Sequence, residues 1–273
     1  MPTPTPSTIP LHGWTPVPLS SSALLLSKPH LHPPTPLLTH DIPFPSSDPL
    51  VLRVQAYAKS QLPLQTYNHS MRVYHWATTI LTQQFPSPPF SLLSPSTLAL
   101  TSLLHDIGTA PSFLSTTQLS FEFAGALVAR DLLLHPHPPS PHQNTPSPST
   151  NPPPPPQSDD TPLATQSQTE AVLEAIIRHQ DIGDKGTITF LGQLIQLATL
   201  YDNVGGNPGL IHEVTKVDVN RAFPRGGWSG CFAATVRDEM RLKPWAHSTH
   251  LGEREFPEGV EGNELMREFD AWE

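Results

Sequence analysis

Cysteine, clustered basic residues and long apolar runs are all scarce in this sequence. The single cysteine, Cys231, excludes a framework of intramolecular disulfides. The formal net charge is −9 and no basic block occurs, so neither nucleic acid nor an anionic membrane is an expected partner. No apolar stretch approaches the roughly 20 residues that span a bilayer, and the start of the chain lacks the cationic region of a secretion signal. We therefore expect a cytoplasmic protein.

Proline, in contrast, is abundant, with 35 prolines among 273 residues. Many lie in residues 1–49 and 135–165, where few apolar side chains are available to offset the entropy lost on ordering. We predict a proline-rich extension over residues 1–47 and one domain over residues 48–273, interrupted by a low-complexity insertion at 135–165. The histidines of these segments are interpreted as solvated side chains rather than as ligands: His30, His32, His40, His135, His137 and His142.

The remaining segments show the apolar periodicity of helices. Asp48 and Pro49 form an N-cap followed by a proline at the first helical position, and Gly108 is a natural C-cap residue. No pair of alternating strands joined by a tight turn occurs, so the fold class is predicted to be all-α, a helical bundle. The predicted helices cover residues 48–61, 65–84, 95–108, 120–134, 168–181, 188–203, 212–222, 230–243 and 263–272.

Helical phase places three polar residues on apolar faces. His69 shares a face with apolar residues of its helix, and His179 and Asp202 fall on apolar stripes of theirs. His75 lies further round the same helix as His69, and we expect it to be solvated. A single inward histidine is more often a hydrogen-bonded core residue than a ligand. The coincidence of several such residues on separate helices favours a shared site.

The adjacent pair His105-Asp106 interrupts an apolar stretch just before Gly108. A carboxylate buried there is costly unless a positive charge neutralises it, and the end of a helix carries partial negative charge that also favours a cation. Imidazole and carboxylate groups together are ligands of zinc, iron and manganese. The sequence therefore predicts one divalent metal ion, zinc first, with iron and manganese as alternatives.

An isolated histidine, an adjacent His-Asp pair and a distant aspartate resemble the HD-domain superfamily of metal-dependent hydrolases. Longer segments look like its fungal cyanamide hydratase family, over most of residues 42–134 and 166–270. These segments are Asn68–Val73, Leu104–Thr109, Ser120–Phe123, Ile177–Asp181, Leu200–Gly205, and the stretch from Phe223-Pro224-Arg225 to His247.

The resemblance implies an HD-domain helical bundle with the metal held by His69, His105, Asp106 and Asp202. It places His179 near the open coordination positions, as a proton acceptor, a fifth ligand or a group that orients substrate. The implied reaction is that of a hydro-lyase, the hydration of cyanamide to urea, with a small neutral substrate.

Three residues outside the predicted ligand set, and the class of substrate, are the subject of further expectations. Asn68 and Thr109 are candidates for binding substrate, whereas Glu122 is interpreted as a first-turn helix charge. Many HD phosphohydrolases have a lysine where this chain has Thr109, and no glycine-rich phosphate loop occurs, which disfavours a phosphoester substrate.

Three function classes and the oligomeric state stay open at this level. Arg72 and Arg178 keep the phosphohydrolase alternative open, because either could bind a phosphate. A non-catalytic scaffold of the same fold is the third alternative. Self-association into a homo-oligomer is also left open.

Overall fold

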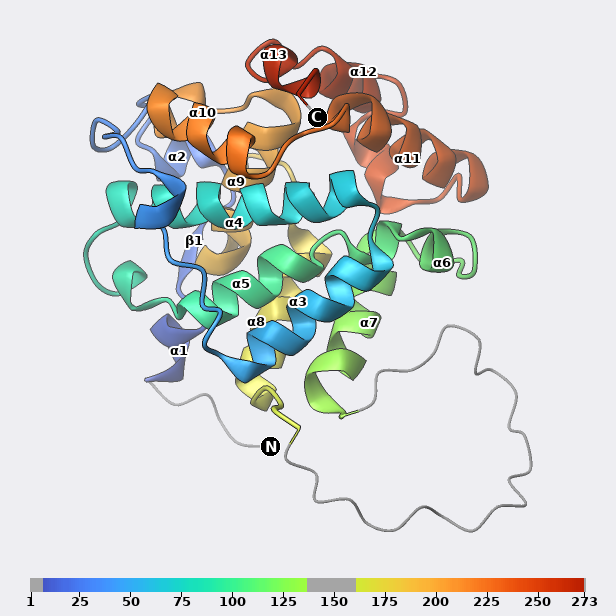
Figure 1. The fold of residues 1–273 in the computed structure, drawn as a ribbon, viewed down its shortest axis with the longest axis horizontal. Coiled ribbons are helices and arrows are strands. Elements are labelled where there is room, and N and C mark those ends of the chain that lie inside the picture. Colours follow the sequence, from blue (N-terminus) through green and yellow to red (C-terminus); the bar gives the residue numbers. More distant parts are fainter. Residues whose placement is uncertain (1–6, 137–160, 273) are drawn as a thin grey trace.

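The computed structural model describes residues 7–136 and 161–272, and these are mostly helical, which confirms the all-α prediction. Two three-residue strands form a small sheet (Figure 1). In the described part, no helix is long and apolar enough to cross a membrane. The elements are α1 (Thr8–Leu11), β1 (Pro16–Pro18), α2 (Ser21–Leu24), α3 (Pro49–Gln61), α4 (Leu64–Gln84), α5 (Pro95–Leu104), η3 (Ile107–Thr109), α6 (Pro111–Leu114), α7 (Phe121–Leu134), α8 (Gln166–Arg178), β2 (Thr187–Thr189), α9 (Phe190–Val204), α10 (Glu213–Ala222), α11 (Trp228–Leu242), α12 (Glu255–Glu261) and α13 (Arg267–Asp270).

Side-chain caps fix where the main helices begin and end. The carboxylate of Asp48 accepts hydrogen bonds from the first backbone amides of α3, and the hydroxyl of Thr189 accepts one from Gly192 at the start of α9. Helix α9 ends at Gly205, which adopts φ +69°, a left-handed conformation that glycine reaches without strain. These caps set the length of the helix that carries Asp202.

Helix α4 lies across the middle of the bundle and packs against α5 and α9 (Figure 1). Its apolar face, including Val73, Ala77 and Ile80, is fully buried. Helix α8 contacts α5, α7 and α9, so the four segments that carry the predicted metal-site residues meet in one place.

The proline-rich N-terminal segment is packed against the bundle, contrary to the prediction that it lacks a packed structure. Val17, Leu25 and Ile42 are buried in the main core. Strand β1 pairs with β2 in antiparallel register, with Val17 opposite Ile188. Prolines at both ends of β1 remove backbone donors but leave Val17 free to bury its side chain. The division at residue 47 stays a prediction, and most of the predicted insertion lies outside the described residues.

Two local predictions on the apolar helices are wrong. Helix α5 ends at Leu104 rather than at Gly108, so His105 and Asp106 lie in the turn between α5 and η3. Gly108 instead allows the two backbones to approach closely, because a Cβ there would lie 2.0 Å from the backbone oxygen of Phe121.

His75 is buried, with 2% of its surface exposed, and not solvated as predicted. Its Nδ1 donates a hydrogen bond to the backbone oxygen of Met71, and its ring packs against the ring of Phe223.

Candidate metal centre

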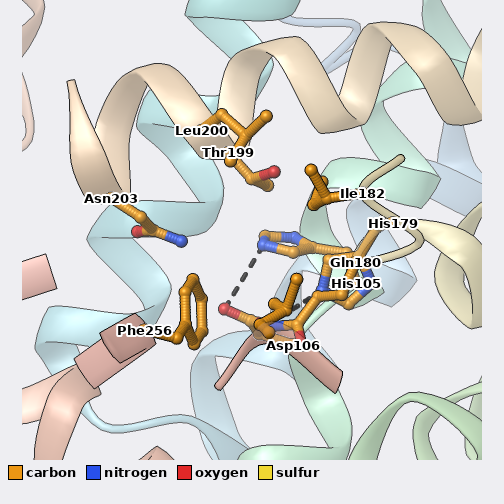
Figure 2. A pocket seen from close by; sticks show the side chains of 10 residues that line it. His105, Asp106, His179, Gln180, Ile182, Thr199, Leu200, Asn203 and Phe256 are labelled. Atoms are coloured by element: carbon orange, nitrogen blue, oxygen red, sulfur yellow. Dashed lines mark ion pairs between the residues drawn. The ribbon is translucent and has the colours of Figure 1, made fainter. Parts of the chain in front are cut away.

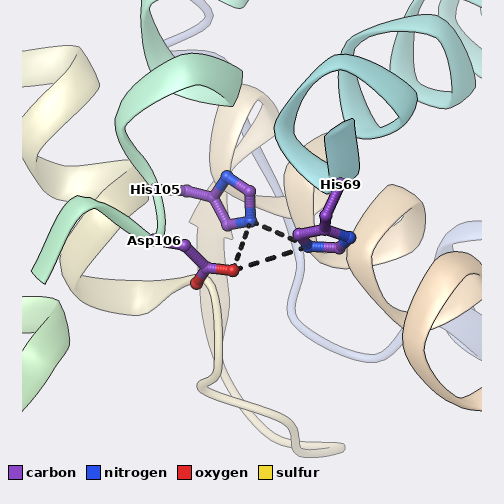
Figure 3. A group of neighbouring side chains, drawn as sticks. All are labelled: His69, His105 and Asp106. Atoms are coloured by element: carbon purple, nitrogen blue, oxygen red, sulfur yellow. Dashed lines mark hydrogen bonds and ion pairs between the residues drawn. The ribbon is translucent and has the colours of Figure 1, made fainter. Parts of the chain in front are cut away.

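His69, His105 and Asp106 come together at the centre of the bundle, from α4 and from the turn after α5 (Figure 3). Each offers one ligand atom, and these atoms lie within 4.8 Å of one another. All three side chains are at most 1% exposed. The structure therefore places three of the four predicted metal ligands side by side.

Hydrogen bonds to the Nδ1 atoms determine which nitrogen of each histidine is free. The Nδ1 of His105 lies 2.8 Å from the backbone oxygen of Ser102, and that of His69 lies 2.7 Å from Oδ2 of Asp202. Because a carbonyl or carboxylate oxygen only accepts, each Nδ1 must donate. In the neutral rings each Nε2 then carries a lone pair, and the two Nε2 atoms lie 3.2 Å apart. Burial would lower the pKa of His105, but Asp106 raises it above its usual value. Without a metal ion, a proton on His105 therefore supplies the positive charge that a bound cation would supply between these groups.

Asp106 supplies the negative charge of this group. Its Oδ2 lies 3.3 Å from Nε2 of His105 and 3.6 Å from Nε2 of His69. Neither carboxylate oxygen has a hydrogen-bond donor among the described residues. A buried carboxylate without donors is costly, so this arrangement fits a bound cation. The donor set of two imidazoles and one carboxylate also fits zinc, iron or manganese.

Asp202 lies behind His69 rather than within this three-residue group. Its Oδ1 accepts from Nε of Arg72 at 2.9 Å and from Nε1 of Trp76 at 3.0 Å, and it lies 3.2 Å from Nη1 of Arg225. Its Oδ2 accepts from Arg72 at 2.9 Å and from His69. Protein donors thus surround both oxygens, and the geometry differs from the predicted direct contact with the ion. A carboxylate in this position orients the imidazole and makes it a better ligand.

Burial and neighbouring charges shift the pKa values of these groups. Burial lowers the pKa of His69 to about 4, against the opposing effect of Asp202. Burial would raise the pKa of both aspartates, but His105 and His69 hold the pKa of Asp106 well below its usual value, and Arg72 and Arg225 do so for Asp202. Both carboxylates are therefore ionised at neutral pH.

His179 caps the C-terminal end of α8 and faces the same group, as predicted from its helical phase. Its Nδ1 donates to the backbone oxygen of Ile176 at 2.7 Å, so its Nε2 carries the lone pair. That Nε2 lies 3.7 Å from Oδ1 of Asp106. Burial, reinforced by the neighbouring His105, lowers the pKa of His179 and keeps the imidazole neutral.

A small cavity opens beside Asp106 and His179 (Figure 2). The cavity volume is about 20 Å³, room for one or two water molecules. Helix α9 forms one wall and the segment around α12 forms another. The lining residues are His105, Asp106, His179, Gln180, Ile182, Thr199, Leu200, Asn203, Leu251 and Phe256.

Several residues around the site were not identified from the sequence. Thr199 and Asn203 follow one another by a helical turn on α9, next to Asp202, which is the spacing that could have indicated them. Trp228 stacks on His69 with ring centres 4.3 Å apart. Its position depends on a long-range contact that no local pattern reveals.

The two residues predicted to bind substrate lie outside the lining of this cavity. The amide of Asn68 donates to the backbone oxygen of Pro224. The hydroxyl of Thr109 donates to the backbone oxygen of Asp106, so Thr109 stabilises the turn that presents the carboxylate. Glu122 lies in the first turn of α7 as predicted, but it is fully buried and faces His247 at 3.3 Å.

The fold and the site define a helical bundle with a buried two-histidine, one-carboxylate group that could bind a metal ion. Comparison with curated proteins gives 36% identity over 212 residues to cyanamide hydratase DDI2 of Saccharomyces cerevisiae, covering 78% of this chain and 81% of that protein. Cyanamide hydratase DDI3 of the same yeast gives the same figures. The chain belongs to the cyanamide hydratase family. No family model matches it.

Proposed function

We propose that this protein hydrates the nitrile carbon of cyanamide to give urea, with the help of one divalent metal ion. The observation that carries the proposal is the small cavity beside the unpaired carboxylate of Asp106 and the free Nε2 of His179. Cyanamide has three non-hydrogen atoms and no charge, which suits a cavity of this size. The relatives from yeast, named cyanamide hydratases, support the same substrate.

The residues that would hold the ion are His69 and His105 through Nε2, and Asp106 through its carboxylate. We propose zinc, because two imidazoles and one carboxylate form a known catalytic zinc ligand set, and an open position remains for water or substrate. When bound, the ion lowers the pKa of a water molecule and polarises the nitrile. Asp202 holds the ring of His69 through Nδ1, which leaves Nε2 facing Asp106, where it would be available to the ion.

His179 is the proposed proton carrier. Water addition forms a C–O bond while one π-bond pair of the nitrile moves to nitrogen, so a proton must leave the water and a proton must reach that nitrogen. The neutral Nε2 of His179 faces the cavity and can accept the first proton and return it to nitrogen. The resulting isourea becomes urea when its remaining O–H proton transfers to nitrogen.

Neither of the two arginines that could have bound a phosphate is free to do so, which argues against the phosphohydrolase alternative. Arg72 is fully buried and paired with Asp202. Arg178 pairs with Asp181 and Glu174. A nucleoside monophosphate would also need far more space than the cavity offers.

The test is an activity panel on the purified, zinc-loaded protein. We expect urea from cyanamide and no phosphate from nucleoside monophosphates, with metal-stripped protein as the control. Phosphate release without urea formation would contradict the proposal and favour the phosphohydrolase alternative. Inactivity towards every substrate at full metal occupancy would favour the scaffold alternative.

A further inference from the structure

Asn203 lies on the last turn of α9, about 100° round the helix axis from the neighbouring Asp202. Its side chain lines the cavity, and the residue is 6% exposed. In Figure 2 the amide nitrogen of Asn203 points into the cavity, towards the ring of His179. None of the roles described above involves this amide.

Trp228 determines which way the amide of Asn203 is turned. The indole Nε1 of Trp228 lies 2.9 Å from Oδ1 of Asn203. An indole nitrogen can only donate, so the oxygen of the amide must face the tryptophan and the NH₂ group must face away from it. Trp228 itself is 1% exposed and stacks on both His69 and Phe232, with ring centres 4.3 and 5.0 Å away. The orientation of the amide is therefore built into the core.

The NH₂ group that results donates no hydrogen bond to the described residues, and its nitrogen is not among their fully buried atoms without a partner, so it is open to the cavity. A donor held in this way can give its hydrogen bond to a ligand in the cavity. The cavity has a donor on the Asn203 side, whereas Asp106 and the free Nε2 of His179 on the other side can accept. A ligand with an acceptor at one end and a proton to give at the other would match both sides.

We propose that the amide nitrogen of Asn203 donates a hydrogen bond to the substrate nitrogen that gains electrons during water addition, and that Trp228 is the positioning residue for this amide. The inference rests on the proposed function. The nitrile nitrogen of cyanamide has a lone pair, and its negative charge grows as the C–O bond forms. A preoriented donor at that point stabilises the transition state more than the bound substrate. Removing this donor is therefore expected to lower kcat more than it changes KM.

Three variants test the donor and its orientation in the zinc-loaded protein. Asn203→Leu removes the donor at similar size, and Asn203→Asp keeps an acceptor for Trp228 but replaces the donor by a second oxygen. We expect kcat on cyanamide to fall by about 10²- to 10³-fold in both, the range for one lost transition-state donor. Trp228→Phe keeps the ring stacked on His69 but frees the amide to turn over, and we expect a loss of about tenfold in kcat. Metal content should stay at the wild-type level in all three.

A double variant separates positioning from general damage. The two oxygens of a carboxylate are equivalent, so an aspartate at position 203 has no orientation to fix. Trp228→Phe should therefore lower kcat in the wild type but cause no further loss in the Asn203→Asp background. Trp245→Phe makes the same change at an exposed tryptophan whose Nε1 donates to the backbone oxygen of Gln118, and it should leave kcat and KM within twofold.

The outcomes distinguish this inference from the proposed function. An active wild type with unchanged kcat in both Asn203 variants would overturn the inference and leave the proposed function standing. Additive losses in the double variant would overturn the role of Trp228. A wild type without activity on cyanamide would overturn the proposed function itself. Circular dichroism of each variant shows whether it folds, and if Asn203→Leu does not, Asn203→Asp decides.

Discussion

Asp106 and Asp202 are two aspartates buried to the same degree, yet their surroundings are opposite. Asp202 has donors on both oxygens, including two arginines and an indole, whereas Asp106 has none among the described residues. One His69 ring lies between them, with Nδ1 towards Asp202 and Nε2 towards Asp106. The comparison shows that burial alone does not identify a metal ligand. A carboxylate completed by protein donors can orient a neighbouring side chain, whereas a carboxylate left incomplete is available to a cation.

The largest expected effect comes from removing the incomplete carboxylate. Asp106→Asn should reduce bound zinc from about one equivalent to near zero and abolish urea formation, because the charge that retains the ion is lost. The metal-stripped variant should lose less stability than metal-stripped Asp202→Asn, because Asp106 faces only histidines and no arginine. Elemental analysis and thermal unfolding with and without chelator measure both. Stoichiometric zinc in Asp106→Asn would contradict the ligand assignment.

Removing the complete carboxylate should instead damage the fold. Asp202→Asn leaves Arg72 buried without its counter-charge, whereas Arg225 keeps its ion pair with Asp270. Breaking a buried pair by removing one partner costs about 3–5 kcal/mol. We expect a loss of that order in the free energy of unfolding of the metal-stripped protein, measured by urea denaturation. Asp106→Asn is the matched control. Equal stability of the two variants would remove the distinction between the aspartates.

His179→Gln tests the role of His179, whose Nε2 lies 3.7 Å from Oδ1 of Asp106. We expect zinc to stay near one equivalent while turnover falls by about 10²- to 10⁴-fold, the usual range for a general acid–base group. Elemental analysis and steady-state kinetics on the same sample provide the measurement. Loss of zinc in this variant would show that His179 is a ligand and not a proton carrier.

The smallest effect is expected at the edge of the site, where His247 faces Glu122 and Asp181 at 3.3 and 3.2 Å. The hydrogen bond to Glu122 raises the pKa of His247 above 6.5. A raised pKa in the folded state means stabilisation that is fully present below pH 6.5 and lost as the pH rises through the raised value. His247→Gln should remove up to about 1 kcal/mol of this pH-dependent stability.

The control for this small effect is His40→Gln, because the His40 side chain is 75% exposed. Urea denaturation from pH 5 to pH 9 should show a shallower loss of stability with rising pH in His247→Gln than in the wild type or in His40→Gln. The same pH dependence in all three proteins would show that His247 contributes nothing to it.

Most of the helices and the inner site residues could be predicted from the sequence, because both depend on periodicity. His69 and His179 lie inward as their helical phase required, and the His105-Asp106 pair interrupts an apolar run. The donors around Asp202 could not be predicted in this way. They come from Arg72, Trp76 and Arg225. No local sequence pattern predicts that Arg225 folds back onto α9 and contacts Asp202.

The proline-rich N-terminal segment shows a second limit on what amino-acid composition can predict. A high proline content disfavours long helices, and α1 and α2 in this segment have only four residues each. It does not exclude packing, since a few apolar side chains such as Val17 and Leu25 suffice to anchor the segment. The pairing of β1 with β2 joins positions more than 160 residues apart. Such pairings depend on the complete fold and not on any short stretch.

The hydrogen bonds to Asp202 also set the order in which the site can form. Its backbone oxygen accepts from Arg225 and from the amide of Asn263, which lies 61 residues further along the chain. At a synthesis rate of about 5–20 residues per second, Asn263 emerges seconds after Asp202. His69 and the His105-Asp106 pair emerge earlier than any of these groups. The support behind His69 is completed only after the segment around Asn263 has emerged, so a metal ion that depends on this support would be retained only late in folding.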